Sequence, residues 1–149
     1  MSKNNFAPLF AAIVLSGCVT AMPDPAMEQR KILDDARASS ISRVNDYASE
    51  TKLFLEKNGT EKTITTAQEH IKKGMKDPDS AKFQNARLVD FDKGAVVCGE
   101  VNAKNSYGGY VGYRPFVASP TLAMVTKVDG KYEALDAAFN AGIFLACGR

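Results

Sequence analysis

Side chains able to carry out catalysis or to bind a metal are few in this chain of 149 residues. It has one histidine, His70, three cysteines, and 17 Asp and Glu residues. A Ser-His-Asp triad would have to use His70, and no serine stands in a GxSxG elbow. A zinc site draws its ligands from His, Cys and carboxylates, and one histidine with these cysteines offers no credible set. We therefore expect no metal, no cofactor and no enzymatic activity.

Carboxylate pairs keep one catalytic alternative open. Glu100 with Asp90 or Asp92 could flank a glycosidic bond, one carboxyl acting as general acid and the other as base or nucleophile. The sequence does not set the separation of these groups. A small cell-wall hydrolase is the enzymatic alternative that follows.

The start of the chain carries the most specific pattern. An apolar run from Phe6 to Leu15 follows Lys3 and closes in Leu15-Ser16-Gly17-Cys18. This tetrapeptide resembles the lipobox of bacterial lipoproteins. In that family a diacylglyceryl group is added to the cysteine thiol and the chain is cut just before it, which implies lipidation of Cys18.

The resemblance implies a protein that is anchored by lipid to the cell envelope. About ten apolar residues are too few to span roughly 30 Å of hydrocarbon, but they suffice for a signal-peptide core. Val19 follows the cysteine, whereas Asp at that position favours retention at the inner membrane in the family, so the periplasmic face of the outer membrane is expected. An ordinary cleaved signal and a short uncleaved anchor are the alternatives.

Cys98 and Cys147 remain once Cys18 is assigned to lipid. In an oxidising compartment an even pair of cysteines commonly forms a disulfide. Closure of a loop of about 50 residues would stabilise the fold by roughly 4 kcal/mol in the chain-entropy model. We therefore predict a Cys98–Cys147 disulfide.

The composition argues against a nucleic-acid partner. Removal of residues 1–17 takes away Lys3 and leaves 132 residues with 18 basic and 17 acidic side chains. A nucleic-acid-binding domain of this size usually has a strongly basic face. A length of 132 residues suits one domain with one modest core.

The chain divides into four expected parts: residues 1–17 as signal peptide, 18–27 as lipidated tether, 28–59 as amphipathic helix, and 60–149 as an α+β globular domain. Two prolines, Pro23 and Pro25, favour an extended tether. Asn58-Gly59 predicts the end of the first helix. Thr66 and Glu69 form a capping box, which predicts a second helix from Thr66 to about Lys76.

After Asp77-Pro78-Asp79 the pattern changes to strands separated by short connections, which indicates antiparallel neighbours. We expect two N-terminal helices followed by an antiparallel sheet of about four to five strands, closed by the disulfide. The tail from Ala137 to Gly148 fits either a short helix or a final strand. The expected strands are Arg87 to Phe91, Ala95 to Asn102, Tyr110 to Ala118, Thr121 to Val128 and Lys131 to Leu135.

The segment between the second and third expected strands is rich in Tyr, Gly and Asn, with two cationic side chains. Asn and Gly suit positive backbone torsions, and tyrosines offer large rings with polar tips. One interpretation is a hairpin connection that satisfies its own backbone; the other is a recognition surface. The candidate binding residues are Asn102, Lys104, Asn105, Tyr107, Tyr110, Tyr113 and Arg114.

The stretches Lys76 to Phe83 and Cys98 to Phe116 resemble a small domain that recurs in uncharacterised bacterial and phage-associated envelope proteins. The resemblance covers roughly Ile71 to Cys147. It implies that the chain contains this domain. It implies no activity, because none is established for the domain.

The function that these features predict is a lipid-anchored, non-catalytic binding or accessory module for an envelope protein or a cell-wall component. The alternatives are the cell-wall hydrolase and a phage-encoded lipoprotein that blocks superinfection at an outer-membrane receptor.

The lipobox generates the first prediction. Cys18→Ser removes the thiol that accepts the lipid, so the precursor should stay unprocessed and take up no labelled fatty acid. Metabolic labelling with radioactive palmitate, followed by electrophoresis, measures both effects. Wild-type labelling of the variant would show that the anchor is assigned to the wrong residue.

Overall fold

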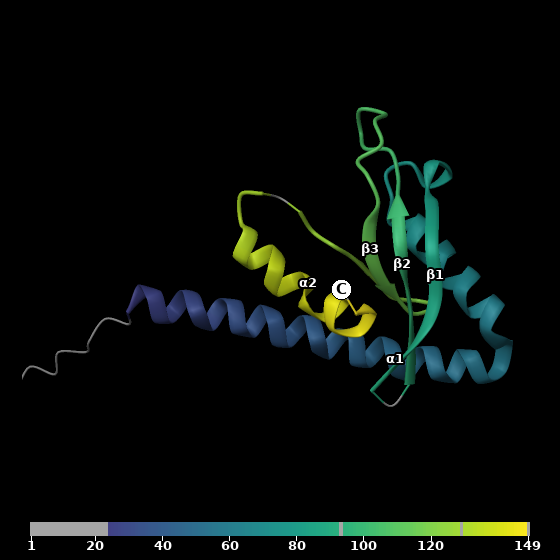
Figure 1. Cartoon of the computed structure of the whole chain (residues 1–149), viewed down its shortest axis with the longest axis horizontal. Helices are drawn as coiled ribbons and strands as arrows, with labels where there is room; N and C mark the ends of the chain where they lie inside the picture. Colours follow the sequence, from purple (N-terminus) through teal and green to yellow (C-terminus); the bar gives the residue numbers. More distant parts are fainter. Residues whose placement is uncertain (1–23, 93, 129, 149) are drawn as a thin grey trace, which may run out of the picture.

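The computed structural model describes residues 24–92, 94–128 and 130–148. The lipobox, the signal peptide and most of the expected tether, Cys18 included, lie outside the described residues. The elements follow the order α1 (Pro25–Lys73), η1 (Pro78–Ser80), β1 (Lys82–Phe91), β2 (Gly94–Asn102), β3 (Arg114–Ala118), β4 (Ala123–Val125) and α2 (Glu133–Cys147). The expected α+β class is confirmed (Figure 1).

The four strands form one antiparallel sheet in the order β1-β2-β3-β4. Side chains alternate between the two faces of a strand, and both faces of β2 are buried. Val96 and Cys98 pack with Val117 into one cluster, whereas Val97 and Val101 pack into another. A sheet of this kind needs a helical cover on each side.

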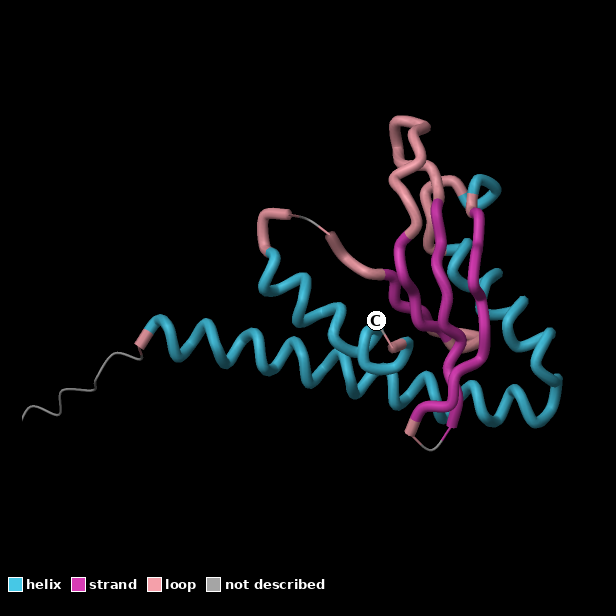
Figure 2. The backbone as a smooth tube through the Cα atoms, viewed as in Figure 1, coloured by secondary structure: helices cyan, strands magenta, loops and turns pink. Residues whose placement is uncertain are grey.

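A single helix supplies cover on both faces because it bends sharply at Gly59. There the backbone has φ 77° and ψ 173°, a conformation that is open to glycine and costly for other residues. Before the bend, Val44 and Ala48 pack on the Val96 face, together with α2. After it, Ala67 and Ile71 pack on the Val97 face. Figures 1 and 2 show α1 running past the sheet and turning back on its other side.

This arrangement corrects the prediction of two separate helices. Asn58-Gly59 marks a bend within α1, and Thr66 lies inside the helix, so its expected role as an N-terminal cap is wrong. The residue that does cap α1 is Asp24, whose carboxylate accepts a hydrogen bond from the Ala26 amide at 2.9 Å. The helix therefore begins at Pro25, three residues before the expected Glu28.

The expected strand from Lys131 to Leu135 is also wrong, because α2 begins at Glu133. Acidic residues in its first turn, Glu133 and Asp136, suit the positive end of the helix dipole. Gly148 ends the helix in a left-handed conformation with φ 75°. The ambiguous tail is thus helical, and the sheet has four strands in the described part of the chain.

Strand boundaries differ from expectation at three further places. β1 begins at Lys82 rather than Arg87, because a bulge at Asn85, with φ 55°, lets a polar stretch pair with β2. β3 begins at Arg114 rather than Tyr110, and β4 is limited to Ala123–Val125.

The helices α1 and α2 cross at very close range. The Ser40 hydroxyl donates to the Phe139 carbonyl oxygen at 2.7 Å and accepts from the Gly142 amide at 2.9 Å. A Cβ on Gly142 would lie 2.5 Å from the Ser40 carbonyl oxygen and 2.8 Å from a Val44 methyl group. Only glycine allows this approach.

Gly142→Ala should therefore force α1 and α2 apart and lower the free energy of unfolding by about 1–3 kcal/mol, the usual cost of overpacking. Chemical denaturation followed by circular dichroism measures it. Gly74→Ala is the matched control, because its Cβ would meet only the Ile71 carbonyl oxygen at 3.5 Å. Equal stability of both variants and wild type would contradict the close crossing.

Candidate functional site

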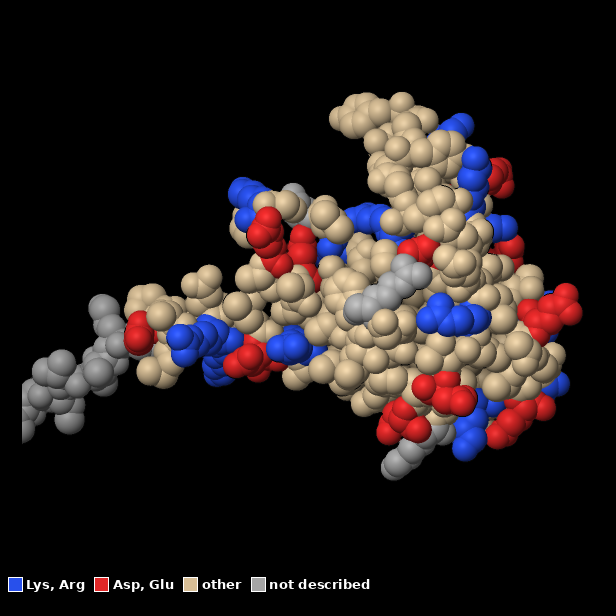
Figure 3. Space-filling view, in the orientation of Figure 1, with Lys and Arg blue, Asp and Glu red and all other residues tan. Residues whose placement is uncertain are grey.

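The predicted binding residues lie on and beside the loop 103–113, which joins β2 to β3. The loop projects beyond the end of the sheet in Figure 1. A bridge between Lys104 and Tyr110 continues the antiparallel pairing into the loop. The surface of this projection is mostly uncharged, with basic side chains along one edge (Figure 3).

Asn105 organises the tip of the loop. Its side-chain oxygen accepts hydrogen bonds from the amides of Tyr107 at 2.9 Å and Gly109 at 3.1 Å. Its own amide donates to the Gly109 carbonyl oxygen at 2.9 Å, and its carbonyl oxygen accepts from the Gly108 amide at 3.0 Å. Gly108 has φ 80°, which closes the turn without strain.

Two further contacts hold the base of the loop. The Asn102 side-chain oxygen accepts from the Gly112 amide at 3.1 Å, and the Ser80 hydroxyl oxygen accepts from the Lys104 amide at 2.9 Å. The oxygens of Asn102 and Asn105 are thus engaged by the loop's own backbone. Among the predicted residues, these two act as internal supports that hold the loop in shape.

The tyrosines of the loop are exposed. Tyr107 at the tip is 97 % exposed, Tyr110 44 % and Tyr113 42 %, and the neighbouring Val111 is 54 % exposed. Large apolar side chains on a loop that is held by hydrogen bonds lose little conformational entropy when a partner covers them. The geometry therefore suits recognition of another molecule.

Tyr110 lies between two cations. The Lys82 ammonium is 4.6 Å from its ring centroid, and the Lys104 ammonium is 5.7 Å from it. Both distances fall within the range of cation–π attraction. The sequence analysis missed Lys82, since β1 was expected to begin at Arg87; the register that pairs Lys82 with Asn102 brings it to the loop.

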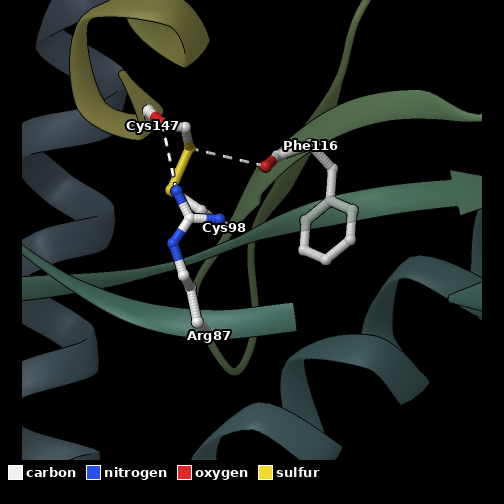
Figure 4. The surroundings of a disulfide bond; sticks show 4 residues. All are labelled: Arg87, Cys98, Phe116 and Cys147. Carbon is white, nitrogen blue, oxygen red and sulfur yellow. Dashed lines mark hydrogen bonds between the residues drawn. A yellow bond between two sulfur atoms is a disulfide. The ribbon is translucent and has the colours of Figure 1, made fainter. Parts of the chain in front are cut away.

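The disulfide predicted from the sequence joins Cys98 to Cys147, with a Cα–Cα distance of 5.7 Å (Figure 4). It ties the end of α2 to the middle of β2, in the cluster where α1 meets the sheet. Arg87 donates to the Cys147 carbonyl oxygen at 3.3 Å, which satisfies the negative end of the α2 dipole. Cys147 Sγ also lies 3.6 Å from the Phe116 carbonyl oxygen. This is a van der Waals contact and not a hydrogen bond, because a sulfur in a disulfide carries no proton to donate.

The candidate carboxylates are far apart along the sheet. Asp90 pairs with Ala95, five positions before Glu100 on β2, which corresponds to about 16 Å at 3.3 Å per residue. Catalytic carboxylates of glycosidases lie about 5–9.5 Å apart. Asp92 follows β1 at the hairpin, farther still from Glu100. Glu100 instead accepts hydrogen bonds from Gln84 at 2.6 Å and Asn85 at 3.3 Å.

Among the described residues, few other side chains could bind a metal ion or act as a catalytic acid or base. No group of three His, Cys, Asp or Glu side chains there could hold a metal ion. Burial raises the pKa of the Tyr47 phenol; Arg43 opposes the shift, whereas Asp46 and Glu50 add to it. Tyr47 lies in the core and not near the loop. In residues 24–92, 94–128 and 130–148, no helix has the length and apolar character needed to cross a bilayer.

The fold and the site define a small α+β domain with a projecting tyrosine-rich loop. No protein-family profile, no curated protein and no solved structure matches this chain. The resemblances to bacterial lipoproteins and to the small envelope domain remain predictions from the sequence.

Asn105→Ala should loosen the tip of the loop, because two amides lose their acceptor. At about 1 kcal/mol per hydrogen bond, hydrogen exchange at Tyr107 and Gly109 should accelerate at least about fivefold while the global unfolding midpoint stays nearly constant. Exchange measured by NMR reports each amide. Ser106→Ala, at an exposed neighbour, is the control; equal rates in both variants would contradict this role for Asn105.

Proposed function

We propose that this chain is a lipid-anchored envelope protein that acts as a non-catalytic binding module, with the loop 103–113 as its recognition surface. The observation that carries the proposal is the combination of an exposed Tyr107 with a loop backbone held by Asn102, Asn105 and Ser80. The partner is an envelope protein or a cell-wall component.

The residue types of the loop support recognition. Tyrosine and arginine are enriched among the residues that dominate binding energies, and Tyr107, Tyr113 and Arg114 belong to this surface. The hydrogen bonds of Asn105 fix the loop before binding, which reduces the entropy lost in the complex. A loop that served only to connect two strands would not need three exposed tyrosines.

The lipobox supports the anchor. Lipidation at Cys18, with two or more acyl chains, would hold the protein stably on a membrane. Val19 favours the periplasmic face of the outer membrane. A phage-encoded exclusion lipoprotein would be a special case of such a module.

The separation of Glu100 from Asp90 gives the hydrolase alternative no support. Binding to a partner explains the exposed tyrosines without any catalytic group.

Tyr107→Ala/Tyr113→Ala should reduce partner recovery at least tenfold, because it removes two exposed rings at little cost to the core. Tagged full-length protein, cross-linked in living cells and purified from membranes, is analysed by quantitative mass spectrometry. The control is Lys52→Ala/Leu53→Ala, since Leu53 is 70 % exposed on α1. Circular dichroism checks that each variant is folded.

Recovery of the same partner at the same level by the loop variant and wild type would contradict the proposal. Loss of function in Glu100→Gln with full function in the loop variant would favour the hydrolase instead.

A further inference from the structure

β4 leaves one edge of the sheet unpaired among the described residues. The Ser119 amide donates to the Leu122 carbonyl oxygen at 2.8 Å, and the Thr126 amide donates to the Pro115 carbonyl oxygen at 2.9 Å. Hydrogen-bonded pairs alternate with non-bonded pairs in an antiparallel ladder, so Met124 is the residue of β4 that bonds to β3. The amides and carbonyls of Ala123 and Val125 therefore point away from the sheet.

These outward groups have no hydrogen-bond partner within residues 24–92, 94–128 and 130–148. They repeat at a spacing of two residues, which is the spacing that a further strand requires. The opposite edge is different: β1 has a bulge at Asn85 and carries Lys82, Arg87 and Asp90, features that prevent pairing at an edge. β4 has only three residues, so few backbone hydrogen bonds could hold an added strand. Side chains beside β4 would have to contribute to binding it.

A groove runs along β4. Its first part, of about 380 Å³, lies between the end of α1 and the strand and is lined by His70, Lys73, Ala123 and Val125. Its second part, of about 360 Å³, continues to the base of the loop and includes Lys76, Lys104 and Arg114. Both parts share Gly74, Met75 and Val125, so they adjoin. We call the whole the basic groove.

The charge of the basic groove has one sign. Four cationic side chains, Lys73, Lys76, Lys104 and Arg114, line it together with His70, and no Asp or Glu of the described part of the chain does so. Two carboxylates close to it in sequence have other partners: Glu69 pairs with Lys72 at 2.7 Å, and Asp77 accepts from the Ser80 amide at 3.2 Å. Its apolar lining includes Met75, Val101 and Val111.

We infer that the basic groove binds an extended acidic peptide segment of the partner, which adds to β4 as a fifth strand. Backbone groups would pair with Ala123 and Val125, apolar side chains would contact Met75 and Val101, and carboxylates would meet the cationic rim. A second copy of this chain is disfavoured, because its own basic groove would face the first. The inference rests on the proposed function and names the chemistry of the partner.

The test uses the full-length lipidated protein in detergent and a fluorescent decapeptide of alternating Glu and Val. A decapeptide of alternating Lys and Val is the matched control probe. Fluorescence anisotropy should show binding of the Glu-Val peptide only, and the affinity should fall as salt increases because rim charges are screened.

Lys73→Glu/Lys76→Glu should weaken binding at least tenfold. Lys57→Glu/Lys62→Glu makes the same charge change on α1, at residues that do not line the basic groove, and should leave the affinity unchanged. Ala123→Pro removes an outward amide without breaking a bond to β3 and should abolish binding. If the proline variant does not fold, the two charge variants still decide the result.

Equal binding of the two peptides, or equal effects of the two charge variants, would overturn the inference. Tyr107→Ala/Tyr113→Ala leaves the basic groove intact and should retain peptide binding. Loss of cellular partner recovery in that variant, with no binding of the Glu-Val peptide to wild type, would contradict the inference and leave the proposed function standing. Retained peptide binding with unchanged partner recovery would contradict the proposed function alone.

Discussion

Burial of β2 on both faces is the constraint on which the other elements depend. Val96 and Cys98 need cover on one side, and Val97 and Val101 need it on the other. The chain meets both needs with one helix, because Gly59 turns α1 around the sheet. The close crossing of α2 on α1 and the disulfide to Cys98 then complete the cover on the first face.

The sequence predicted those features whose causes are local or compositional. Short connections indicated an antiparallel sheet, and the parity of the cysteines indicated the disulfide; the structure agrees with both. The bend at Gly59 was expected only as a helix end, because a glycine signals a break without showing where the chain continues. Lys131 to Leu135 was mistaken for a strand, since the alternation of a short segment cannot show that α2 packs on Ser40.

The candidate site was predictable to a similar degree. Composition alone pointed to the loop 103–113, and the structure shows that Tyr107 in this loop is exposed; its role in binding stays a prediction. The role of each residue within the loop depends on its contacts, which cannot be derived from composition. Asn105 is an example, because its side chain supports the tip through hydrogen bonds to the backbone. Lys82 and the groove along β4 depend on strand register and on the return of α1 across the sheet, so they could be found only in the folded chain.

The disulfide has a consequence for proteolysis. An exposed loop such as 103–113 is where proteases cut most readily, and this loop lies between Cys98 and Cys147 in sequence. A single cut at its tip separates the chain into two pieces that remain covalently joined through those cysteines. The fragment that ends after β2 and the fragment that begins before β3 also keep their strand pairing. A nicked molecule therefore holds its fold and its attachment to the N-terminal segment for as long as the Cys98–Cys147 disulfide is not reduced.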